Sequence, residues 1–452
     1  MKYSAREQCL PCGVLFFMRV FLSAGEPSGD HHAALLVRSL KSRRPDVECI
    51  GLGGPCMAAE GCRLIADLTQ LAVMWFLRVI LNIHRFVELA RRAERSFIDA
   101  RPDVCVLVDF PGFHWWLAWR AKRHGIPVVF YCPPQIWAWA NWRIHKMRRR
   151  IDHVLAALPF EHDWFVAQGM SSTLVGHPFF DELHALHPSG SAGPAAASEA
   201  AAAARPVVLL LPGSRCQEIE ANLTTILRAA AEVALRVPQS RFVVGALHDK
   251  HAARVRETIA TLGPTLDRLD RLDIQVEAGR ARSLMQEATC AIAVSGSVSL
   301  ELLAARVPTV IVYRISGFAY VVQSWLRRAR FITLVNLLAA REPVGPTRPQ
   351  WWPPQEVAPA DPAAIFPEYL AVQDPASHLA GHVVEWLTQP AVRRDVIRQL
   401  DAVADQVARS GSADRAAEAV LAFVAQGRPT RETGAGFATP AADQCRPTAD
   451  AA

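Results

Sequence analysis

The chain has 452 residues, of which 51% are hydrophobic and 20% are charged. That is enough apolar material for two domains with their own cores, and it excludes a chain that is disordered throughout. The formal net charge of +6 is compatible with an anionic substrate, an anionic membrane face or RNA, and does not choose among them. Most of the ten cysteines stand in apolar runs, which is typical of a reduced protein.

The sequence contains no apolar stretch of the length that crosses a bilayer. The apolar run at 10–17 is short, and Arg19 follows it without the small-residue cleavage site of a signal peptide. We therefore expect a cytoplasmic protein in which residues 1–17 form an N-terminal extension.

The first half of the chain alternates short apolar runs with amphipathic segments. Residues 104–108 are apolar throughout, as in a strand that is buried on both faces. Such alternation predicts βαβ units around a parallel sheet. The predicted strands are 19–23, 48–52, 104–108, 128–131 and 153–157.

The second half repeats this pattern after an Ala-rich segment that resembles a linker. Each half opens with a strand and a Gly-containing turn, so we predict an α/β protein with two Rossmann-like domains facing each other across a ligand cleft. The predicted strands of the second half are 206–211, 241–244, 274–276, 291–294 and 309–312. The predicted parts are the domain 18–187, the linker 188–204, the domain 205–375 with a Pro-rich insertion at 345–366, C-terminal helices at 376–426 and a disordered tail at 427–452.

The strongest local signal is the segment 295–301, which follows a buried strand and opens a helix. Free backbone N–H groups and the positive end of the helix dipole suit a diphosphate there, and the hydroxyls of Ser295 and Ser297 add hydrogen bonds. Glu301 lies one turn further in, where a carboxylate can accept from two vicinal ribose hydroxyls. A capped helix without a ligand explains the segment about equally well.

Gly213, Ser214 and Arg215 follow the first strand of the same half. Glycine lets a ligand approach the backbone, and Arg215 offers a planar fork to a phosphate. The alternative is an ordinary turn with a surface arginine. Two such turns at strand ends in one half favour nucleotide binding.

On the opposite side, Asp109 ends the third strand and is a candidate general base for a sugar hydroxyl. An Asp before Pro and Gly also often caps a helix or turn, and this alternative stays open. The turn after the first strand has too few glycines for a dinucleotide fingerprint and lacks the lysine of a P-loop, but it can wrap around a hydroxyl-rich ligand. Its candidate residues are Gly25, Glu26, Ser28, Gly29 and Asp30.

Aromatic and basic residues supply further candidates. Trp137 follows the fourth strand, where an indole can stack on a sugar or line an acyl channel, although packing is the commoner role. His177 closes the first half as a ligand contact or hinge residue. The stretches 75–97 and 318–338 combine large apolar residues with arginines. They suit helices on an anionic lipid surface, or core helices with a charged outer face.

Taken together, these segments resemble the lipid-A-disaccharide synthase family, which are inverting glycosyltransferases of the two-lobed B type. The resemblance extends from Met18 to about residue 425, and its pieces stand in the family's order. They include 23–30, 71–74, Asp109 with Pro111 and Phe113, 133–139, 158–161, 175–178, 211–215, 295–301 and 336–342.

The resemblance implies transfer of 2,3-diacylglucosamine from its UDP derivative to 2,3-diacylglucosamine 1-phosphate (lipid X), giving the β-1,6-linked disaccharide and UDP. Asp109 would be the base for the acceptor 6-hydroxyl, and one in-line displacement needs no metal or other cofactor. Lipid substrates imply a peripheral position on the cytoplasmic membrane surface, no nucleic-acid partner, and an oligomeric state that stays open. The residues implied to hold the UDP-sugar are Gly213, Ser214, Arg215, Ser295, Gly296, Ser297, Glu301 and Asn336; the 25–30 turn, Met74, Trp137 and His177 would face the acceptor side.

The chain departs from the family pattern at Trp75 and Arg78, where Gly and Glu are usual, and at His114, where Asn is frequent. Two other functions stay open. One is a UDP-sugar epimerase on a related scaffold, and the other is a diverged homologue that binds UDP-sugars or lipids without transferring them.

Overall fold

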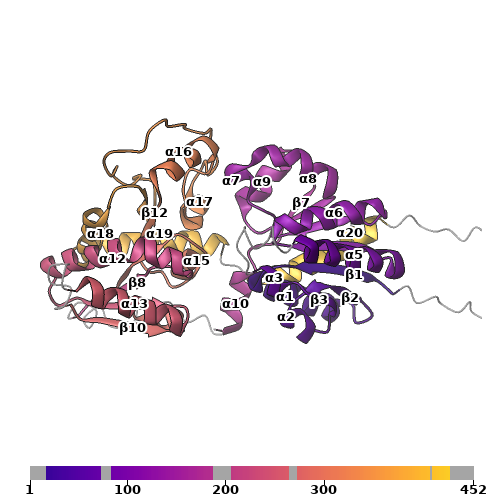
Figure 1. Cartoon of the computed structure of the whole chain (residues 1–452), viewed down its shortest axis with the longest axis horizontal. Helices are drawn as coiled ribbons and strands as arrows, with labels where there is room; N and C mark the ends of the chain where they lie inside the picture. The colour runs from indigo at the N-terminus through magenta and orange to yellow at the C-terminus, as the bar shows by residue number, and fades with distance from the viewer. Residues whose placement is uncertain (1–16, 73–82, 187–204, 264–271, 408–409, 428–452) are drawn as a thin grey trace, which may run out of the picture.

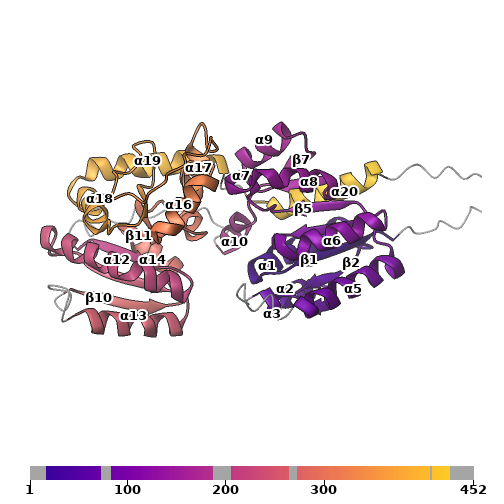
Figure 2. The same cartoon turned by 45° about the horizontal axis from the view of Figure 1, so that its top comes forward.

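The computed structural model describes residues 17–72, 83–186, 205–263, 272–407 and 410–427. It has two lobes, one built on each predicted half of the chain, and each lobe contains one parallel sheet with helices on both faces (Figures 1 and 2). The predicted fold class is therefore confirmed. The expectations for Met74, Trp75, Arg78, the 188–204 linker and nearly all of both termini lie outside the described residues.

The first lobe contains a seven-stranded sheet in the order β3-β2-β1-β4-β5-β6-β7. The five predicted strands are present, but β3 and β7 were not predicted. These two strands lie at the edges of the sheet and have no fully buried residue, so they lack the apolar run by which a strand is recognised. The strands are β1 (Arg19–Ala24), β2 (Glu48–Gly53), β3 (Arg63–Asp67), β4 (Val104–Val108), β5 (Val128–Tyr131), β6 (His153–Ala156) and β7 (Ser172–Leu174).

Helices cover both faces of this sheet because successive side chains of each strand point in opposite directions. In β4, Cys105 and Leu107 join one buried cluster, while Val104 and Val106 join the cluster on the other face. The helices of this lobe are α1 (Pro27–Arg43), α2 (Pro55–Ala59), α3 (Thr69–Ala72), α5 (Ile83–Ala100), α6 (Pro111–Arg123), α7 (Ile136–Trp139), the 3₁₀ turn η1 (Asn141–Arg143), α8 (Ile144–Arg150), α9 (Pro159–Ala167) and α10 (Phe179–Leu186).

The second lobe contains a six-stranded sheet in the order β10-β9-β8-β11-β12-β13. Here too the five predicted strands are present, and the short edge strand β13 was missed. The strands are β8 (Val207–Leu211), β9 (Arg241–Ala246), β10 (Ile274–Ala278), β11 (Cys290–Val294), β12 (Thr309–Arg314) and β13 (Glu368–Ala371). The helices are α12 (Cys216–Arg236), α13 (Asp249–Leu262), α14 (Ala281–Glu287), α15 (Val298–Ala304), α16 (Gly317–Leu326), α17 (Leu334–Ala339), α18 (Ala376–Thr388) and α19 (Pro390–Val407).

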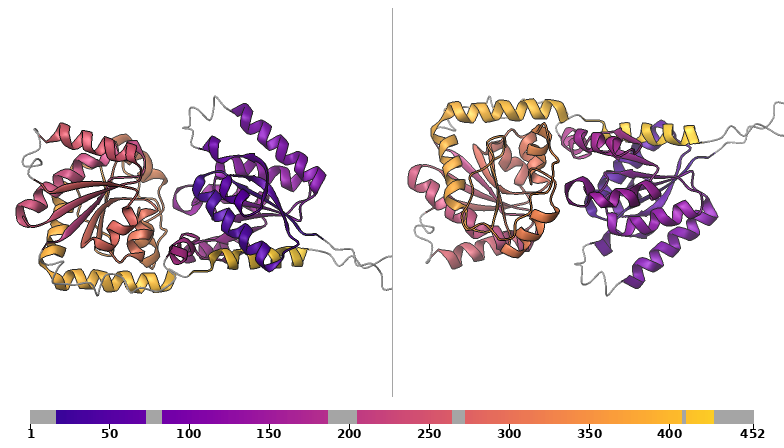
Figure 3. Two further views of the ribbon diagram at one scale, coloured as in Figure 1. Left: turned by 90° about the horizontal axis from the view of Figure 1, so that it is seen from below. Right: turned by 90° about the horizontal axis from the view of Figure 1, so that it is seen from above.

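The predicted C-terminal helical segment is divided between the lobes (Figure 3). Helices α18 and α19 complete the second lobe, whereas α20 (Ser412–Gly427) packs against α1 of the first. The small residues Ala416 and Ala417 are fully buried at this contact and allow the two helices to approach closely. Every helix in the described ranges is too short or too polar to cross a membrane.

Candidate functional site

A pocket of about 640 Å³ opens between the two lobes, at the carboxyl ends of their strands. This is the position expected for a ligand of facing Rossmann-like domains. Five predicted site residues line it together, and they come from both halves of the chain: Trp137, His177, Ser295, Gly296 and Ser297. Other lining residues include Gln135, Trp139, Gln323, Leu326 and Arg327.

The lobes also touch directly beside this pocket. The backbone N–H groups of Arg328 and Ala329 donate to the carbonyl oxygen of Ala138 at 2.7 and 3.1 Å. Trp137 packs with Phe331 and other apolar residues of the second lobe in one small cluster. Helix α7, which forms this wall of the pocket, therefore packs against the second lobe as well as against the first lobe, to which it belongs.

Trp137 is fully buried, and its ring is fixed by Glu161 of α9. The indole Nε1–H donates to Glu161 Oε1 at 3.0 Å, and the other carboxyl oxygen accepts from the Ala157 N–H at 3.1 Å. Burial raises the pKa of Glu161 to about 7. Trp137 thus forms a rigid wall of the pocket, and the exposed indole on α7 is Trp139.

Because burial favours the neutral acid, the folded protein keeps the Glu161 proton at pH values where the unfolded chain has lost it. Its stabilising contribution is complete below the ordinary pKa of 4.5 and is lost as the pH rises through about 7. We expect the free energy of unfolding of the wild type to fall by about 2 kcal/mol between pH 5 and pH 8 relative to Glu161→Gln. Urea unfolding at both pH values measures this difference, and parallel profiles for the two proteins would contradict it.

The turn between β11 and α15 carries Ser295, Gly296 and Ser297 to the second wall of the pocket. The Ser295 hydroxyl donates to the Ile332 carbonyl oxygen at 2.7 Å, which joins this turn to the segment before α17. Ser297 is the N-cap residue of α15, but its side chain makes no capping bond. The capped-helix interpretation therefore does not account for its hydroxyl.

The other residues predicted to hold UDP lie outside the lining of this pocket, beginning with Glu301 and Asn336. Glu301 is on α15 and accepts from Arg282 Nε at 3.2 Å. Asn336 is buried on α17, where its amide bonds to both backbone groups of Phe366 and to Glu368. The amide is thus engaged within the second lobe, and its contact with UDP stays a prediction.

The β8–α12 turn forms a smaller pocket of about 350 Å³ with Arg314. Glu218, which sequence reasoning missed, places a carboxylate in this turn. It accepts from the Ser214 N–H at 2.9 Å and pairs with Arg215 at 3.0 Å. Gly213 has a φ of +134°, and a side chain there would meet Glu218. Arg215 is otherwise exposed, so its guanidinium is accessible to a phosphate from the cleft.

On the acceptor side, Asp109 stands at the end of β4 in a left-handed backbone conformation, with φ of +54°, and Phe110 follows with +49°. Such conformations cost about 1 to 3 kcal/mol each for non-glycine residues and persist only where the surroundings impose them. His114 supplies part of that restraint. Its Nδ1 contacts the Asp109 carbonyl oxygen at 2.6 Å, and its Nε2 contacts Ser23 Oγ at 2.9 Å.

His114 is fully buried, and burial lowers its pKa to about 3, so the ring is neutral. With Nδ1–H donating to Asp109, Nε2 accepts from the Ser23 hydroxyl. The histidine that departs from the family pattern at this position therefore supports the backbone of Asp109. The sequence showed that His114 stands five residues after Asp109, but it did not show the contact between them.

Asp109 and Arg215, which come from different lobes, both influence the carboxyl group of Glu26. Burial raises the pKa of the Asp109 carboxyl, and the Phe110 backbone N–H opposes this rise. Burial and the nearby Asp109 raise the pKa of Glu26, while Arg215 of the other lobe opposes this rise. The half-buried carboxylates and the guanidinium thus share one electrostatic environment, in which a carboxylate is a stronger base than in water.

The 25–30 turn divides into residues beside Asp109 and residues that hold the fold. A methyl group on Gly29 would lie 3.6 Å from Asp109 Cβ, and Gly25 faces the Phe110 ring. Asp30 is buried, and its carboxylate accepts from the backbone N–H groups at the start of α2. Ser28 is exposed. Asp30 therefore has a structural role, and a ligand contact through it stays a prediction.

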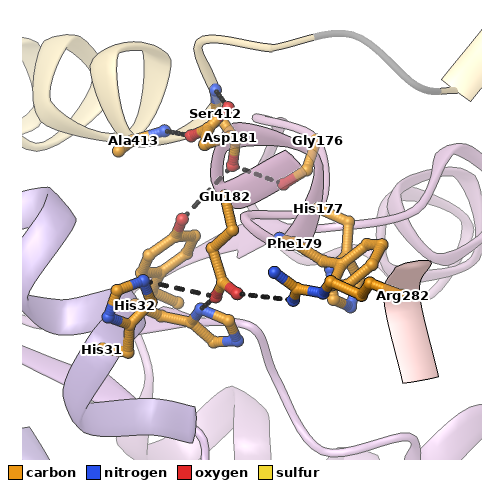
Figure 4. A network of polar contacts seen from close by, with 11 residues as sticks. His31, His32, Gly176, His177, Phe179, Asp181, Glu182, Arg282, Ser412 and Ala413 are labelled. Atoms are coloured by element: carbon orange, nitrogen blue, oxygen red, sulfur yellow. Dashed lines mark hydrogen bonds and ion pairs between the residues drawn. The ribbon is translucent and has the colours of Figure 1, made fainter. Parts of the chain in front are cut away.

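A network of polar contacts surrounds α10 at the junction of the lobes (Figure 4). Asp181 accepts from the backbone N–H groups of Ser412 and Ala413 at 2.9 and 2.8 Å, which caps α20. Its neighbour Glu182 points to the other side of α10, toward histidines of α1 and toward Arg282. His177 lies beside this network and lines the pocket, and its role as a ligand contact or a hinge residue stays a prediction.

Comparison with known proteins gives the following similarities. The model of the family described as lipid-A-disaccharide synthetase matches residues 20–347. The lipid-A-disaccharide synthase of Myxococcus xanthus is 32% identical over 420 residues, which are 91% of this chain and 98% of that protein. Lipid-A-disaccharide synthase 1 of Legionella pneumophila is 31% identical over 393 residues, covering 87% of this chain and 94% of that protein.

Among solved structures, UDP-GlcNAc 2-epimerase from Neisseria meningitidis, bound to UDP-GlcNAc, is similar with a TM-score of 0.53. The sequences are 10% identical, and the match covers 91% of this chain and all (100%) of the other. A glycosyltransferase from Rickettsia africae gives a TM-score of 0.50 at 10% identity, covering 91% and 100%. At these identities the likeness shows a shared two-lobed fold.

Proposed function

The chain belongs to the lipid-A-disaccharide synthetase family, and from that premise we propose that it forms the lipid A disaccharide. The donor is UDP-2,3-diacylglucosamine, the acceptor is lipid X, and the second product is UDP. The observation that carries the proposal is the interlobe pocket, in which residues predicted for the UDP side and for the acceptor side line the same space.

Each lobe has a proposed task. Ser295, Gly296 and Ser297 bind the UDP-sugar with Glu301 accepting from the ribose, and Arg215 balances the diphosphate charge. Asp109 removes the proton from the acceptor 6-hydroxyl, and that oxygen attacks the anomeric carbon opposite the diphosphate. The bond from this carbon to the diphosphate breaks, UDP leaves with the electron pair, and the configuration inverts. A half-buried carboxylate of raised pKa supports the role of base.

The direct test mixes the purified protein with both acylated substrates and measures UDP release and the disaccharide by mass spectrometry. We expect both products in equal amounts, and none when either substrate is omitted. Turnover of a soluble UDP-sugar alone would instead support an epimerase. Tight UDP binding without transfer would support a diverged binding protein.

We also propose that the mouth of the pocket rests on an anionic membrane surface, because both substrates carry acyl chains. Helix α16 is apolar yet has no buried residue, unlike α5, whose Phe86, Leu89 and Phe97 belong to the core. The 345–366 insertion packs on α16, with Trp325 Nε1 donating to the Gln350 carbonyl at 3.0 Å. The exposed apolar residues of this surface are Phe318, Val322, Trp325, Leu326, Trp351 and Trp352.

Charge and position support this proposal. Residues 317–356 contain five arginines and two acidic residues, and so favour anionic headgroups. Leu326 and Trp139 line the same pocket, so the apolar surface reaches its mouth from the second lobe and an exposed indole flanks it on the first. Acyl chains can then stay in the membrane while the sugars enter the cleft.

Replacing both Trp351 and Trp352 by serine should weaken binding to vesicles that contain anionic lipid by about tenfold or more, since two exposed indoles lose their burial in the interface. Vesicle sedimentation measures the effect. Leu235→Ser is the matched control, because Leu235 is exposed on α12 and lies outside this surface. Equal binding of the double variant and the control would contradict the assignment of this surface.

A further inference from the structure

Arg282 of α14 lies between two carboxylates from different parts of the molecule. Its Nε is 3.2 Å from Glu301 Oε2, and its Nη2 is 3.7 Å from Glu182 Oε2. Glu301 belongs to α15 in the second lobe, and Glu182 belongs to α10 at the lobe junction. Figure 4 shows Arg282 and Glu182 pointing toward each other from separate elements. The Arg282 guanidinium thus links Glu301, the proposed partner of the ribose hydroxyls, to α10 at the lobe junction.

The surroundings hold Arg282 in this orientation. Both carboxylates are largely shielded, with 20% of each side chain exposed, and the Phe179 ring centre is 6.0 Å from the guanidinium carbon. A planar guanidinium that faces two acids and an aromatic ring has few other rotamers that keep these contacts. Arg282 is therefore oriented before any nucleotide binds.

Arg282 also supplies positive charge beside the Glu182 and Glu301 carboxylates. Glu182 Oε1 lies 3.5 Å from His31 Nε2 and 3.5 Å from His32 Nδ1. Burial and the nearby His177 lower the pKa of His32 to about 3, so His32 is neutral beside Glu182. Burial raises the pKa of Glu182, His31 and Arg282 oppose this rise, and Glu301 adds to it. Without Arg282, less positive charge would offset the repulsion between the Glu182 and Glu301 carboxylates.

We infer that Arg282 is a positioning residue of the nucleotide site, which holds the Glu301 carboxylate in the orientation that receives the ribose hydroxyls. Its bond is to one Glu301 oxygen, Oε2, and within the described ranges of the chain Oε1 stays available to the ligand. Through its contact with Glu182, Arg282 also makes the orientation of the Glu301 carboxylate depend on the position of α10 between the lobes. The inference rests on the proposed function, in which Glu301 accepts from the ribose.

The test is a double-mutant cycle on the affinity for UDP, measured by titration calorimetry. We expect Arg282→Ala to weaken UDP binding about tenfold, Arg282→Lys to recover part of it, and Arg282→Ala to have no further effect in a Glu301→Ala background. Arg280→Ala is the matched control, because Arg280 is the exposed N-cap residue of the same helix and, among the described residues, its guanidinium pairs with Glu277 at 3.6 Å. In steady-state kinetics Arg282→Ala should raise KM for the donor and leave kcat nearly unchanged.

Glu182→Gln separates the contact of Arg282 with α10 from its contact with Glu301. It keeps the Arg282–Glu301 pair and should weaken UDP binding by about threefold, less than Arg282→Ala. An unchanged UDP affinity in Arg282→Ala, or the same loss with and without Glu301, would overturn the inference. If Glu301→Ala itself binds UDP like the wild type, the ribose assignment in the proposed function fails as well, and this result is distinct from failure of the Arg282 role alone.

Discussion

Asp109→Asn is expected to lower turnover by about 10² to 10⁴-fold while leaving UDP affinity within about twofold of the wild type. Asparagine keeps the size of the side chain and its contact with the Phe110 N–H, but it cannot take a proton from the acceptor. UDP release under saturating substrates measures the first effect, and calorimetry with UDP measures the second. Binding is spared because the residues proposed for UDP belong to the other lobe.

The pH profile adds a second readout for Asp109. A base acts only when deprotonated, so kcat/KM of the wild type should fall on the acid side through a pKa above the ordinary 3.8 of an aspartate. Asp99→Asn, an exposed change on α5, should retain both the rate and this acid limb. Full turnover in Asp109→Asn would remove Asp109 as the base and would leave the UDP site untouched.

Gly25→Ala is expected to reduce turnover by about 10²-fold although it adds a single methyl group. That methyl would lie 2.2 Å from the Phe110 ring and 2.8 Å from its Cβ, so Phe110 must move near its backbone. Phe110 follows Asp109 in the strained segment after β4, and the shift therefore displaces the carboxylate. Overpacking of this kind also destabilises a protein by about 1 to 3 kcal/mol.

The matched control for this prediction is Gly112→Ala in the first turn of α6. A methyl group there meets nothing within 4 Å, and alanine has the higher helix propensity, so both stability and turnover should be retained. Thermal unfolding and UDP release should be measured on the same preparations. Wild-type turnover in Gly25→Ala would show that the position of Phe110 does not control Asp109.

The chain's sequence was sufficient for the fold because its central strands are buried on both faces. Runs such as 104–108 and 207–211 must be apolar throughout, so the positions of these strands were predictable. Their alternation with helices in turn predicted a parallel sheet. The edge strands β3, β7 and β13 are short and mixed in polarity, and only pairing with a neighbour defines them. Helix α20 was predicted as a helix, but its return to the first lobe depends on contacts with α1.

The sequence by itself also predicted where the proposed chemistry takes place, since Asp109 and the 213–215 and 295–297 turns follow predicted strands, and parallel strands end at one edge of a sheet. Only the tertiary structure decided what each side chain does there. In the folded chain, Asn336 and Asp30 form hydrogen bonds with backbone groups of their own lobes. His114 contacts the backbone of Asp109, and Arg282 contacts the Glu301 carboxylate. Those roles depend on partners far apart in sequence, such as Ser23 for His114, which local residue patterns do not encode.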